Sequence, residues 1–199
     1  MENKIENGNY KRSEIIEQFY KRLNFNKDLI EKTLKDLNMP LNSKILDIGT
    51  GWGIMAITLA QKGYFVITGE PEKDKWADWK TCAEYFNVLD NIKFIYFNAE
   101  KLPFESQSFD YVFMYSSLHH IEQKVKAFYE ALRVIKSDGK LIIIELNQKG
   151  VEKIRKERGS HPDPINPILL LKMPTYEITI IKGEYADAFI FNEPPSATI

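Results

Sequence analysis

Residues 46–53 read Leu46-Asp47-Ile48-Gly49-Thr50-Gly51-Trp52-Gly53, and this stretch decides the fold of the 199-residue chain. It continues a short apolar run that begins near residue 44, and it leads directly into residues 54–60 (IMAITLA), which are compatible with a helix. The glycines therefore lie at a strand-to-helix turn, where they let the backbone pass close to a ligand. The helix that follows presents unpaired N–H groups and a partial positive charge at its start.

The spacing of this loop narrows the class of ligand that it can hold. The pattern is Gly-x-Gly-x-Gly, and Ile54 stands where the dinucleotide fingerprint has its third glycine, so NAD is the weaker interpretation. A P-loop is excluded because no Gly-Lys-Ser/Thr follows. Asp47 would repel a diphosphate and favours a ligand with a cationic part. A tight turn without a ligand stays an alternative for this motif taken alone.

A second acid narrows the ligand further. Residues 64–68 (YFVIT) form a second apolar run, which is followed by Glu70. In a doubly wound sheet, an acid at the tip of the second strand lies beside the first loop and can accept hydrogen bonds from both hydroxyls of a ribose. Asp47 and Glu70 together predict a cofactor that contains a nucleoside, although Glu70 alone would also suit a solvated turn.

From about residue 44 to residue 147, the chain resembles the class I S-adenosylmethionine-dependent methyltransferases, particularly those that act on small molecules. The resemblance depends on the order and spacing of short motifs: the glycine loop, Glu70-Pro71, NAEKLPF at 98–104, SFDYV at 108–112, LHHI at 118–121 and ALRVIKSDGKL at 131–141. It implies a Rossmann-like, doubly wound α/β fold. The sheet would be mostly parallel and seven-stranded, with helices on both faces and a C-terminal antiparallel hairpin.

The resemblance also implies how the cofactor, S-adenosyl-L-methionine, would be held. Asp47 and the loop backbone would hold the methionine end, and Glu70 would hold the ribose hydroxyls. Asn98 stands where the family usually has an acid, and its amide carbonyl can still accept a hydrogen bond from the adenine amino group. The implied cofactor-binding residues are Asp47, Gly49, Thr50, Gly51, Gly53, Glu70, Pro71, Asn98, Ala99, Glu100, Tyr115 and Ser116.

Methyl transfer from a sulfonium is an in-line displacement, so the protein mainly aligns the acceptor with the methyl carbon and excludes water. A base is needed only if the acceptor arrives protonated. His119 is the candidate base because it follows the fourth strand, at the ligand-binding edge of the sheet. A structural or capping role is the alternative. Candidate acceptor contacts are Tyr20, His120, Glu145 and His161. Tyr10 or Tyr20 is also a candidate to close over the sulfonium, because an aromatic face attracts a cation. No metal is assigned, since no ligand spacing supports a metal site, and a site built from the three histidines is left open.

We expect one domain over residues 1–199, with a helical cap at 1–40, a cofactor-binding core at 41–147, and a C-terminal helix, loop and β-hairpin at 148–199. Trp76 and Trp79 are expected to pack on the sheet. Alternating helices and strands predict the parallel sheet. The expected helices are 11–23, 27–38, 72–86 and 122–135, and the later strands are 92–97, 110–115, 140–146, 176–181 and 185–191.

Composition limits the partners and the compartment. The net charge is −1, so no overall field recruits nucleic acid or an anionic membrane. The basic residues within 149–158 are interrupted by acids and indicate a solvated helix face. The single cysteine, Cys82, excludes an internal disulfide, and the polar N-terminus does not resemble a signal peptide, so a cytoplasmic protein is expected.

The predicted function is methyl transfer from S-adenosyl-L-methionine to a small-molecule acceptor. The identity of the acceptor, the atom that is methylated and the oligomeric state are left open. One alternative is the same chemistry on a macromolecule, tRNA or protein. The others are a nucleotide- or NAD-binding oxidoreductase and a non-enzymatic binding module on a related sheet.

Overall fold

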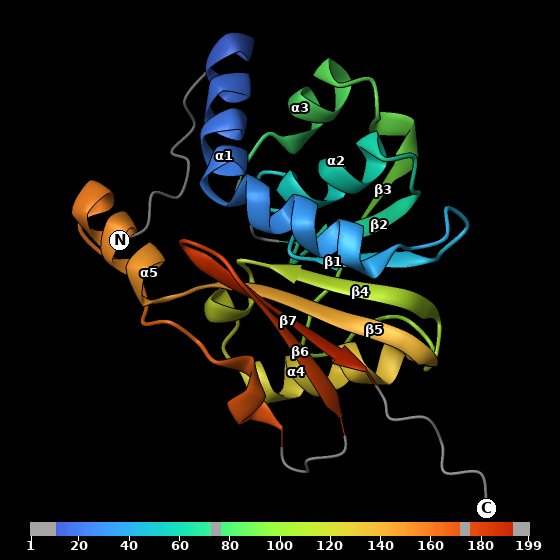
Figure 1. The fold of residues 1–199 in the computed structure, drawn as a ribbon. Coiled ribbons are helices and arrows are strands. Elements are labelled where there is room, and N and C mark those ends of the chain that lie inside the picture. Colours follow the sequence, from blue (N-terminus) through green and yellow to red (C-terminus); the bar gives the residue numbers. More distant parts are fainter. Residues whose placement is uncertain (1–10, 73–76, 172–175, 193–199) are drawn as a thin grey trace, which may run out of the picture.

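A seven-stranded sheet forms the centre of the computed structural model, which describes residues 11–72, 77–171 and 176–192 (Figure 1). The strand order is β3-β2-β1-β4-β5-β7-β6. Strands β1 to β5 run parallel, whereas β7 lies antiparallel between β5 and β6. The doubly wound sheet with a C-terminal hairpin is therefore confirmed. The strands are β1 (Ile45–Ile48), β2 (Val66–Glu70), β3 (Ile92–Tyr96), β4 (Phe109–Tyr115), β5 (Ile135–Leu146), β6 (Glu177–Lys182) and β7 (Ala186–Asn192).

Helices cover both faces of the sheet. In Figure 1, α1, α2 and α3 lie on one face, α4 lies on the other, and α5 projects from the edge. None of the helices formed by the described residues is both long enough and apolar enough to cross a membrane. The helices are α1 (Arg12–Leu37), α2 (Ile54–Gln61), α3 (Trp79–Tyr85), α4 (Lys124–Val134) and α5 (Gln148–Arg158), with short 3-10 helices η1 (Leu89–Asn91), η2 (Leu118–His120) and η3 (Pro167–Leu170).

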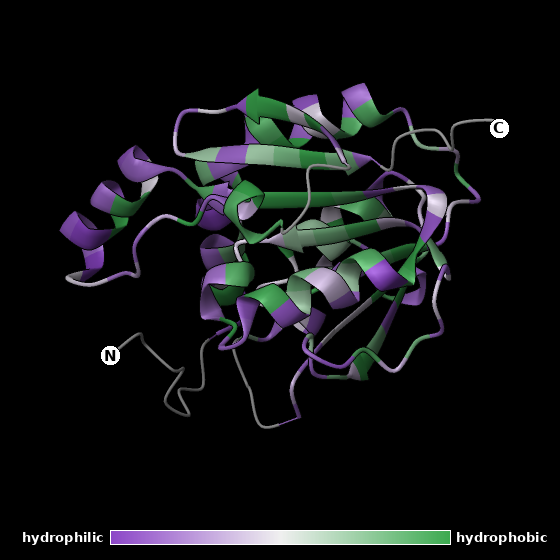
Figure 2. Ribbon diagram, turned by 90° about the horizontal axis from the view of Figure 1, so that it is seen from below, coloured by the Kyte–Doolittle hydropathy of each residue, from purple (hydrophilic) through white to green (hydrophobic). Residues whose placement is uncertain are grey.

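Strand alternation divides the apolar side chains into two layers. In β1, Ile45 packs with α1, α2 and α3, whereas Leu46 and Ile48 pack with α4. Figure 2 shows the central strands as mostly hydrophobic and α5 as mostly hydrophilic. Every residue of α2 from Ile54 to Ala60 is buried, which explains why that helix has no polar stripe. The central parallel strands are thus covered on both faces, as the sequence pattern predicts.

The two predicted N-terminal helices are present, but they meet at a kink rather than at a connecting loop. The two expected helices form one element, α1, which bends at Asn26, where the backbone is not helical (φ −133°, ψ 19°). In Figure 1, the first part of α1 rises beside α3 and the second part crosses above the sheet. The Asn26 amide is buried and donates to the Tyr115 hydroxyl at 3.2 Å. The expected gap between residues 23 and 27 is therefore a bend that is tied to the end of β4.

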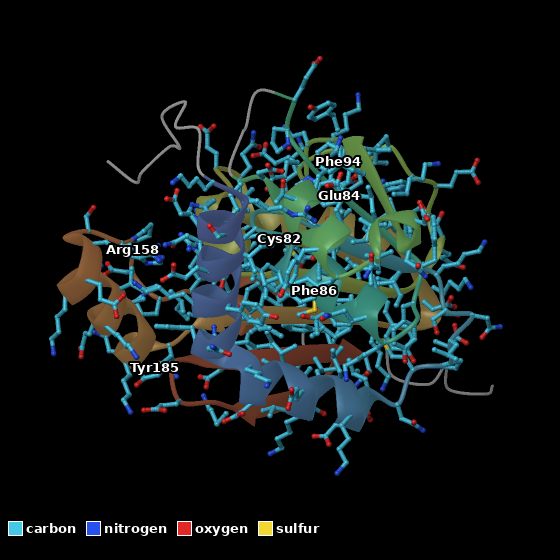
Figure 3. All side chains as sticks on the ribbon, turned by 90° about the horizontal axis from the view of Figure 1, so that it is seen from above. Cys82, Glu84, Phe86, Phe94, Arg158 and Tyr185 are labelled. Atoms are coloured by element: carbon cyan, nitrogen blue, oxygen red, sulfur yellow. The ribbon has the colours of Figure 1, made fainter. Side chains whose placement is uncertain are left out.

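Helix α3 is shorter than the predicted helix at 72–86. It begins at Trp79, because the Asp78 side chain accepts from the Thr81 N–H at 3.1 Å and caps the helix. Trp79 packs on the sheet as expected, and its ring stacks on Phe94 of β3 with centroids 5.5 Å apart. Cys82 is buried between α3 and α1 (Figure 3). Trp76 and Tyr10 lie outside the described residues.

Strand β5 begins earlier than the predicted strand at 140–146. Its pairing with β4 jumps from Phe109–Ile135 to Tyr111–Lys140, so the residues at 136–139 form an irregular excursion within the strand. Asp110 holds this excursion, because its Oδ1 accepts from the Lys136 ammonium at 2.6 Å. Helix α4 therefore connects directly to β5, with no loop between Val134 and Ile135.

Helix α5 projects from the body of the protein. Its inner end lies beside Tyr185 and its outer end is at Arg158 (Figure 3). Within α5, only Gly150 and Val151 are buried. This exposure agrees with the solvated face that the interrupted basic pattern indicates.

Candidate active site

The glycine loop lies at the carboxyl end of β1, which is flanked by β2 and β4. This is the switch point of the sheet, where ligands bind in doubly wound folds. The N–H groups of Gly49 and Thr50 both approach the Gly69 carbonyl, at 3.0 and 3.3 Å. A Cβ at Gly49 would lie 2.5 Å from the Ser117 Cβ, whereas a Cβ at Gly51 would meet nothing within 4 Å. The loop is therefore closed towards the end of β4 and open at Gly51.

Asp47 lies beneath this loop and is 1% exposed. Its Oδ2 accepts from the Thr68 hydroxyl at 2.8 Å, and that hydroxyl lies 2.8 Å from the Thr50 hydroxyl. Its Oδ1 is buried and has no partner among the described residues. Burial raises the pKa of Asp47 to about 7; the Thr68 hydrogen bond lowers it, and the nearby Glu70 charge raises it. A buried carboxylate with one unsatisfied oxygen favours a cationic ligand.

Glu70, at the tip of β2, bridges to the same loop. Its Oε1 accepts from the Gly51 N–H, and the side chain is largely buried. Pro71 follows Glu70 and is exposed at the carboxyl end of β2. This arrangement places the second acid beside the glycine loop, as the motif spacing predicts.

The residues after β3 form a tight turn of their own. The exposed Asn98 accepts from the Glu100 N–H through Oδ1 at 2.8 Å, while Ala99 is buried. Glu100 in turn accepts from the Gln123 N–H at 3.0 Å. An amide oxygen has two lone pairs, so this turn still leaves Asn98 the capacity to accept from a base.

The end of β4 contacts the bend in α1. Tyr115 receives the Asn26 hydrogen bond, and burial raises its pKa to about 12, so the phenol stays neutral at physiological pH. Ser116 follows in a left-handed conformation (φ 47°) and donates its N–H to the Ile144 carbonyl at 2.8 Å. Asn26 was not among the residues singled out from the sequence. Its signal was a polar residue at helical spacing in the apolar stripe that includes Phe19 and Ile30.

The chain has three histidines, and the structure brings all of them together. The imidazole centroid of His119, in η2, lies 4.0 Å from that of His120 and 4.7 Å from that of His161. His119 Nδ1 is 2.7 Å from Glu145 Oε2, and the side chains of the pair are 4% and 2% exposed. Glu145 Oε1 also accepts from the Leu118 N–H at 2.8 Å. Both oxygens of Glu145 therefore bind its neighbours in the fold, which indicates a positioning role for this carboxylate.

His161 reaches this cluster from the loop after α5. Arg155 donates from Nε and Nη2 to the His161 carbonyl, at 2.9 and 2.7 Å, and its Nη2 lies 2.7 Å from Asp163 Oδ1. The arginine thereby folds the loop back towards η2. Among the described residues, no group of three His, Cys, Asp or Glu side chains has a geometry that could hold a metal ion.

Tyr20 occupies a different part of the cap. It is 41% exposed, and its ring contacts Phe19 and Phe86 with centroids 6.1 and 5.7 Å away, at the seam between α1 and α3. The side chain that α1 places on the glycine loop is Arg22, whose guanidinium carbon lies 4.0 Å from the centroid of the Trp52 ring. Arg22 was also missed from the sequence, because it lies in a helix that carries no recognisable motif.

Known proteins share both the core sequence and the fold. Residues 46–143 match a family model described as a methyltransferase domain. The ubiquinone/menaquinone biosynthesis C-methyltransferase UbiE of Rickettsia prowazekii is 35% identical over 114 residues, which cover 54% of this chain and 46% of that relative. The chain thus spans about half the length of the curated relatives that it matches.

Two solved structures match nearly the whole fold. A SAM-dependent methyltransferase from Aquifex aeolicus has a TM-score of 0.68 and 20% identity, with coverage of 92% of this chain and 98% of that chain. A putative S-adenosyl-L-methionine-dependent methyltransferase from Methanococcus maripaludis has a TM-score of 0.68 and 17% identity, with coverage of 98% and 100%. These two structures show the fold alone. The family match over residues 46–143 and the 35% identity to the relative from Rickettsia prowazekii show that the chain belongs to the class I S-adenosylmethionine-dependent methyltransferases.

Proposed function

We propose that this protein transfers the methyl group of S-adenosyl-L-methionine to a small-molecule acceptor. The observation that carries the proposal is the unsatisfied, buried Oδ1 of Asp47 beneath a glycine loop that is open at Gly51. The amino-acid end of this cofactor contains an ammonium group, which suits that carboxylate. The diphosphate of NAD would instead be repelled by it.

The remaining parts of the cofactor suit the rest of this edge. Glu70 would accept from the ribose hydroxyls, and the exposed Pro71 would pack on the adenine ring. Tyr115 and Ser116, at the end of β4, would border the methyl group, which is the electrophile that the bound cofactor supplies. Residues proposed to hold the cofactor are Asp47, Gly49, Thr50, Gly51, Gly53, Glu70, Pro71, Asn98, Ala99, Glu100, Tyr115 and Ser116.

We propose His119 as the base that takes the acceptor proton. A carboxylate only accepts hydrogen bonds, so the Glu145 contact assigns the proton of the neutral imidazole to Nδ1. Nε2 then carries the basic lone pair. As the acceptor–methyl bond forms and the carbon–sulfur bond breaks, the proton of the acceptor would move to Nε2. His120 and His161, whose rings flank His119, are proposed to contact the acceptor.

A small acceptor is supported by the relative from Rickettsia prowazekii, which is named as a C-methyltransferase of quinone biosynthesis. A nucleic-acid acceptor would favour unpaired basic side chains on the projecting α5. Two of the basic residues of α5 are instead paired, Lys149 with Glu184 and Arg155 with Asp163, each at 2.7 Å. These pairs favour the small-molecule proposal over methylation of tRNA.

Calorimetric titration with S-adenosylhomocysteine and, separately, with NAD tests the cofactor. We expect micromolar binding of S-adenosylhomocysteine and none of NAD, and the opposite result would overturn the proposal. Release of S-adenosylhomocysteine from S-adenosylmethionine in the presence of small phenols, quinols and amines then tests the acceptor class. Turnover on tRNA alone, with RNA affinity that falls steeply with salt, would favour the macromolecular alternative.

A further inference from the structure

We propose that Arg22 of α1 completes the cofactor site by binding the α-carboxylate of the cofactor's amino-acid end. This inference rests on the proposed function, because it assumes that the ligand of the glycine loop is S-adenosylmethionine. It adds a carboxylate-binding group to a site that the sequence motifs describe only through acids, glycines and small polar residues. It also gives the helical cap a direct role in holding the cofactor.

The position of Arg22 is fixed from two sides. Its guanidinium carbon lies 4.0 Å from the centroid of the Trp52 ring, and Trp52 stands between Gly51 and Gly53 in the loop. Its Nη1 donates to the Gln18 carbonyl at 3.2 Å and to the Gln18 side-chain oxygen at 2.7 Å. A guanidinium stacked on an aromatic face keeps its N–H donors in its own plane, where they can meet a carboxylate edge-on. The stack therefore orients Arg22 along the glycine loop.

The bend in α1 places this face of the helix against the site. Asn26 follows Arg22 by one helical turn and donates to the Tyr115 hydroxyl at 3.2 Å. Burial raises the pKa of Tyr115 to about 12, and the positive charge of Arg22 opposes that rise, so the guanidinium lies within electrostatic reach of the phenol. One face of α1 thus contacts both the glycine loop and the end of β4, the two elements proposed to enclose the methionine end of the cofactor.

The charges of the two acids in this site favour such a cation when the ligand carries a carboxylate. Asp47 and Glu70 are both buried next to the loop, and their carboxylates suit an ammonium group and a ribose diol. The same two charges would repel the carboxylate of an amino acid. Arg22 brings a positive charge to the loop and offsets this repulsion. Asp47 and Arg22, on opposite charges of the ligand, would therefore together recognise a zwitterionic amino-acid group.

A ligand that lacks the amino-acid end distinguishes carboxylate binding by Arg22 from a general effect of Arg22 on the cofactor site. S-adenosylhomocysteine carries the amino-acid end, whereas 5′-methylthioadenosine lacks it and keeps the adenosine and the sulfur. For Arg22→Ala, we expect the Kd of S-adenosylhomocysteine to rise about 10- to 100-fold, as for the loss of a charge-assisted contact, and the Kd of 5′-methylthioadenosine to change less than about two-fold. Arg22→Lys keeps the charge but loses the planar fork and should give an intermediate loss.

Lys27→Ala is the matched control, since Lys27 is an exposed cation of the same helix whose salt-bridge partner is Glu31, one turn further on. It should leave the Kd of both ligands unchanged. Equal weakening of both ligands by Arg22→Ala, or no change in either, would overturn the inference. An unchanged Kd for S-adenosylhomocysteine with a raised KM for an anionic acceptor would assign the guanidinium to the acceptor and overturn it too. Wild-type protein that binds neither ligand would instead remove the proposed function, and this inference with it.

Discussion

The two halves of the candidate site are built in different ways. The proposed cofactor half, residues 47–53 and Glu70, lies at the ends of two adjacent strands, and its glycine loop is held by backbone contacts of Gly49 and Thr50 with the Gly69 carbonyl. The proposed acceptor half consists of side chains from three separate segments: His119 and His120, His161, and Glu145. A loop held by its backbone needs glycines at fixed positions in the local sequence. It can therefore be recognised from the sequence as a motif. The residues of the side-chain cluster were named from the sequence, but their contacts with one another depend on how distant segments pack, which a short motif does not show.

If the two halves act independently, removal of the proposed base should lower the rate of methyl transfer without weakening cofactor binding. For His119→Ala, we expect kcat to fall about 10²- to 10⁴-fold, the range for loss of a general base, and the Kd of S-adenosylhomocysteine to stay within about two-fold. Turnover of an acceptor from the screen and calorimetry measure the two effects. Glu145→Gln should lower kcat less and shift the pH profile of kcat, because it acts through the His119 imidazole.

The histidine assignment also has a test that needs no acceptor. Because the chain holds three histidines, long-range ¹⁵N–¹H spectra should resolve each imidazole. The neutral His119 should carry its proton on Nδ1. Loss of S-adenosylhomocysteine binding in His119→Ala would show that the two halves are one structural unit, which would break the contrast between them.

Asp47→Asn should have a large effect on the cofactor half. Burial raises the pKa of Asp47 from 3.8 to about 7, so between those values the folded protein keeps a proton that the unfolded chain has lost. The stability contributed by this group is therefore present at low pH and is lost as pH rises towards 7, by on the order of a few kcal/mol. The Asp47→Asn substitution removes this pH-dependent loss of stability, because the amide does not ionise. We expect Asp47→Asn to weaken S-adenosylhomocysteine binding about 100-fold while raising the Tm of the ligand-free protein at pH 8.

Thermal melts at pH 5 and pH 8 check the sign of this effect. The Tm of wild type should fall more between these values than that of Asp47→Asn. If the ammonium of the ligand lies beside Asp47, binding near pH 7 should also release protons, because the nearby cation lowers the raised pKa. Titration in two buffers with different ionisation enthalpies measures that release. Parallel pH dependence in both proteins would contradict the assigned pKa.

Two glycine substitutions should separate folding from binding within the loop. A Cβ at Gly49 would lie 2.5 Å from the Ser117 Cβ, and the backbone there has a φ of +94°. We expect Gly49→Ala to lower the free energy of unfolding by about 1–3 kcal/mol through backbone strain and crowding. Gly51 also has a positive φ (+50°), but its Cβ would meet no protein atom within 4 Å, so Gly51→Ala should cost less stability than Gly49→Ala and should weaken S-adenosylhomocysteine binding. An unchanged Kd for S-adenosylhomocysteine in Gly51→Ala would show that the open space at Gly51 is not a ligand site.

The local parts of the fold were predictable because their signals are short. The apolar run of β1, its glycine loop and the acid after β2 each follow from a few adjacent residues, and the sheet order agrees with them. The start of α3 at Trp79 was missed although Asp78 is a suitable capping residue, because the preceding segment has no residue that excludes a helix. Boundaries of this kind depend on which of several acceptable caps the tertiary contacts select.

The side-chain contacts between distant segments were much less predictable. Of the residues on α1, Tyr20 was chosen for its aromatic ring, yet it lies at the seam with α3. The face that contacts the site carries Arg22 and Asn26 instead. The bend in α1 and its packing determine which face of the helix points towards the site. The periodicity of apolar residues along the helix predicts neither of them. His161 was named from the sequence as a candidate acceptor contact, but its ring contact with His119 was not foreseen, because the hydrogen bond from Arg155 to the His161 carbonyl holds the loop in place.

The smallest effect should come from the contact that joins the cap to the end of β4. Asn26→Ala removes the hydrogen bond to the Tyr115 hydroxyl, and this should cost about 1 kcal/mol, or roughly 2–4 °C in Tm for a domain of this size. Asn24→Ala, at an exposed position of the same helix, is the matched control and should leave Tm unchanged. Because Asn26 lies one turn from Arg22, its loss should also weaken S-adenosylhomocysteine binding slightly, while 5′-methylthioadenosine binds as before. A Tm change without any difference between the two ligands would mean that the bend stabilises the cap alone, and the cofactor half would then be complete without α1.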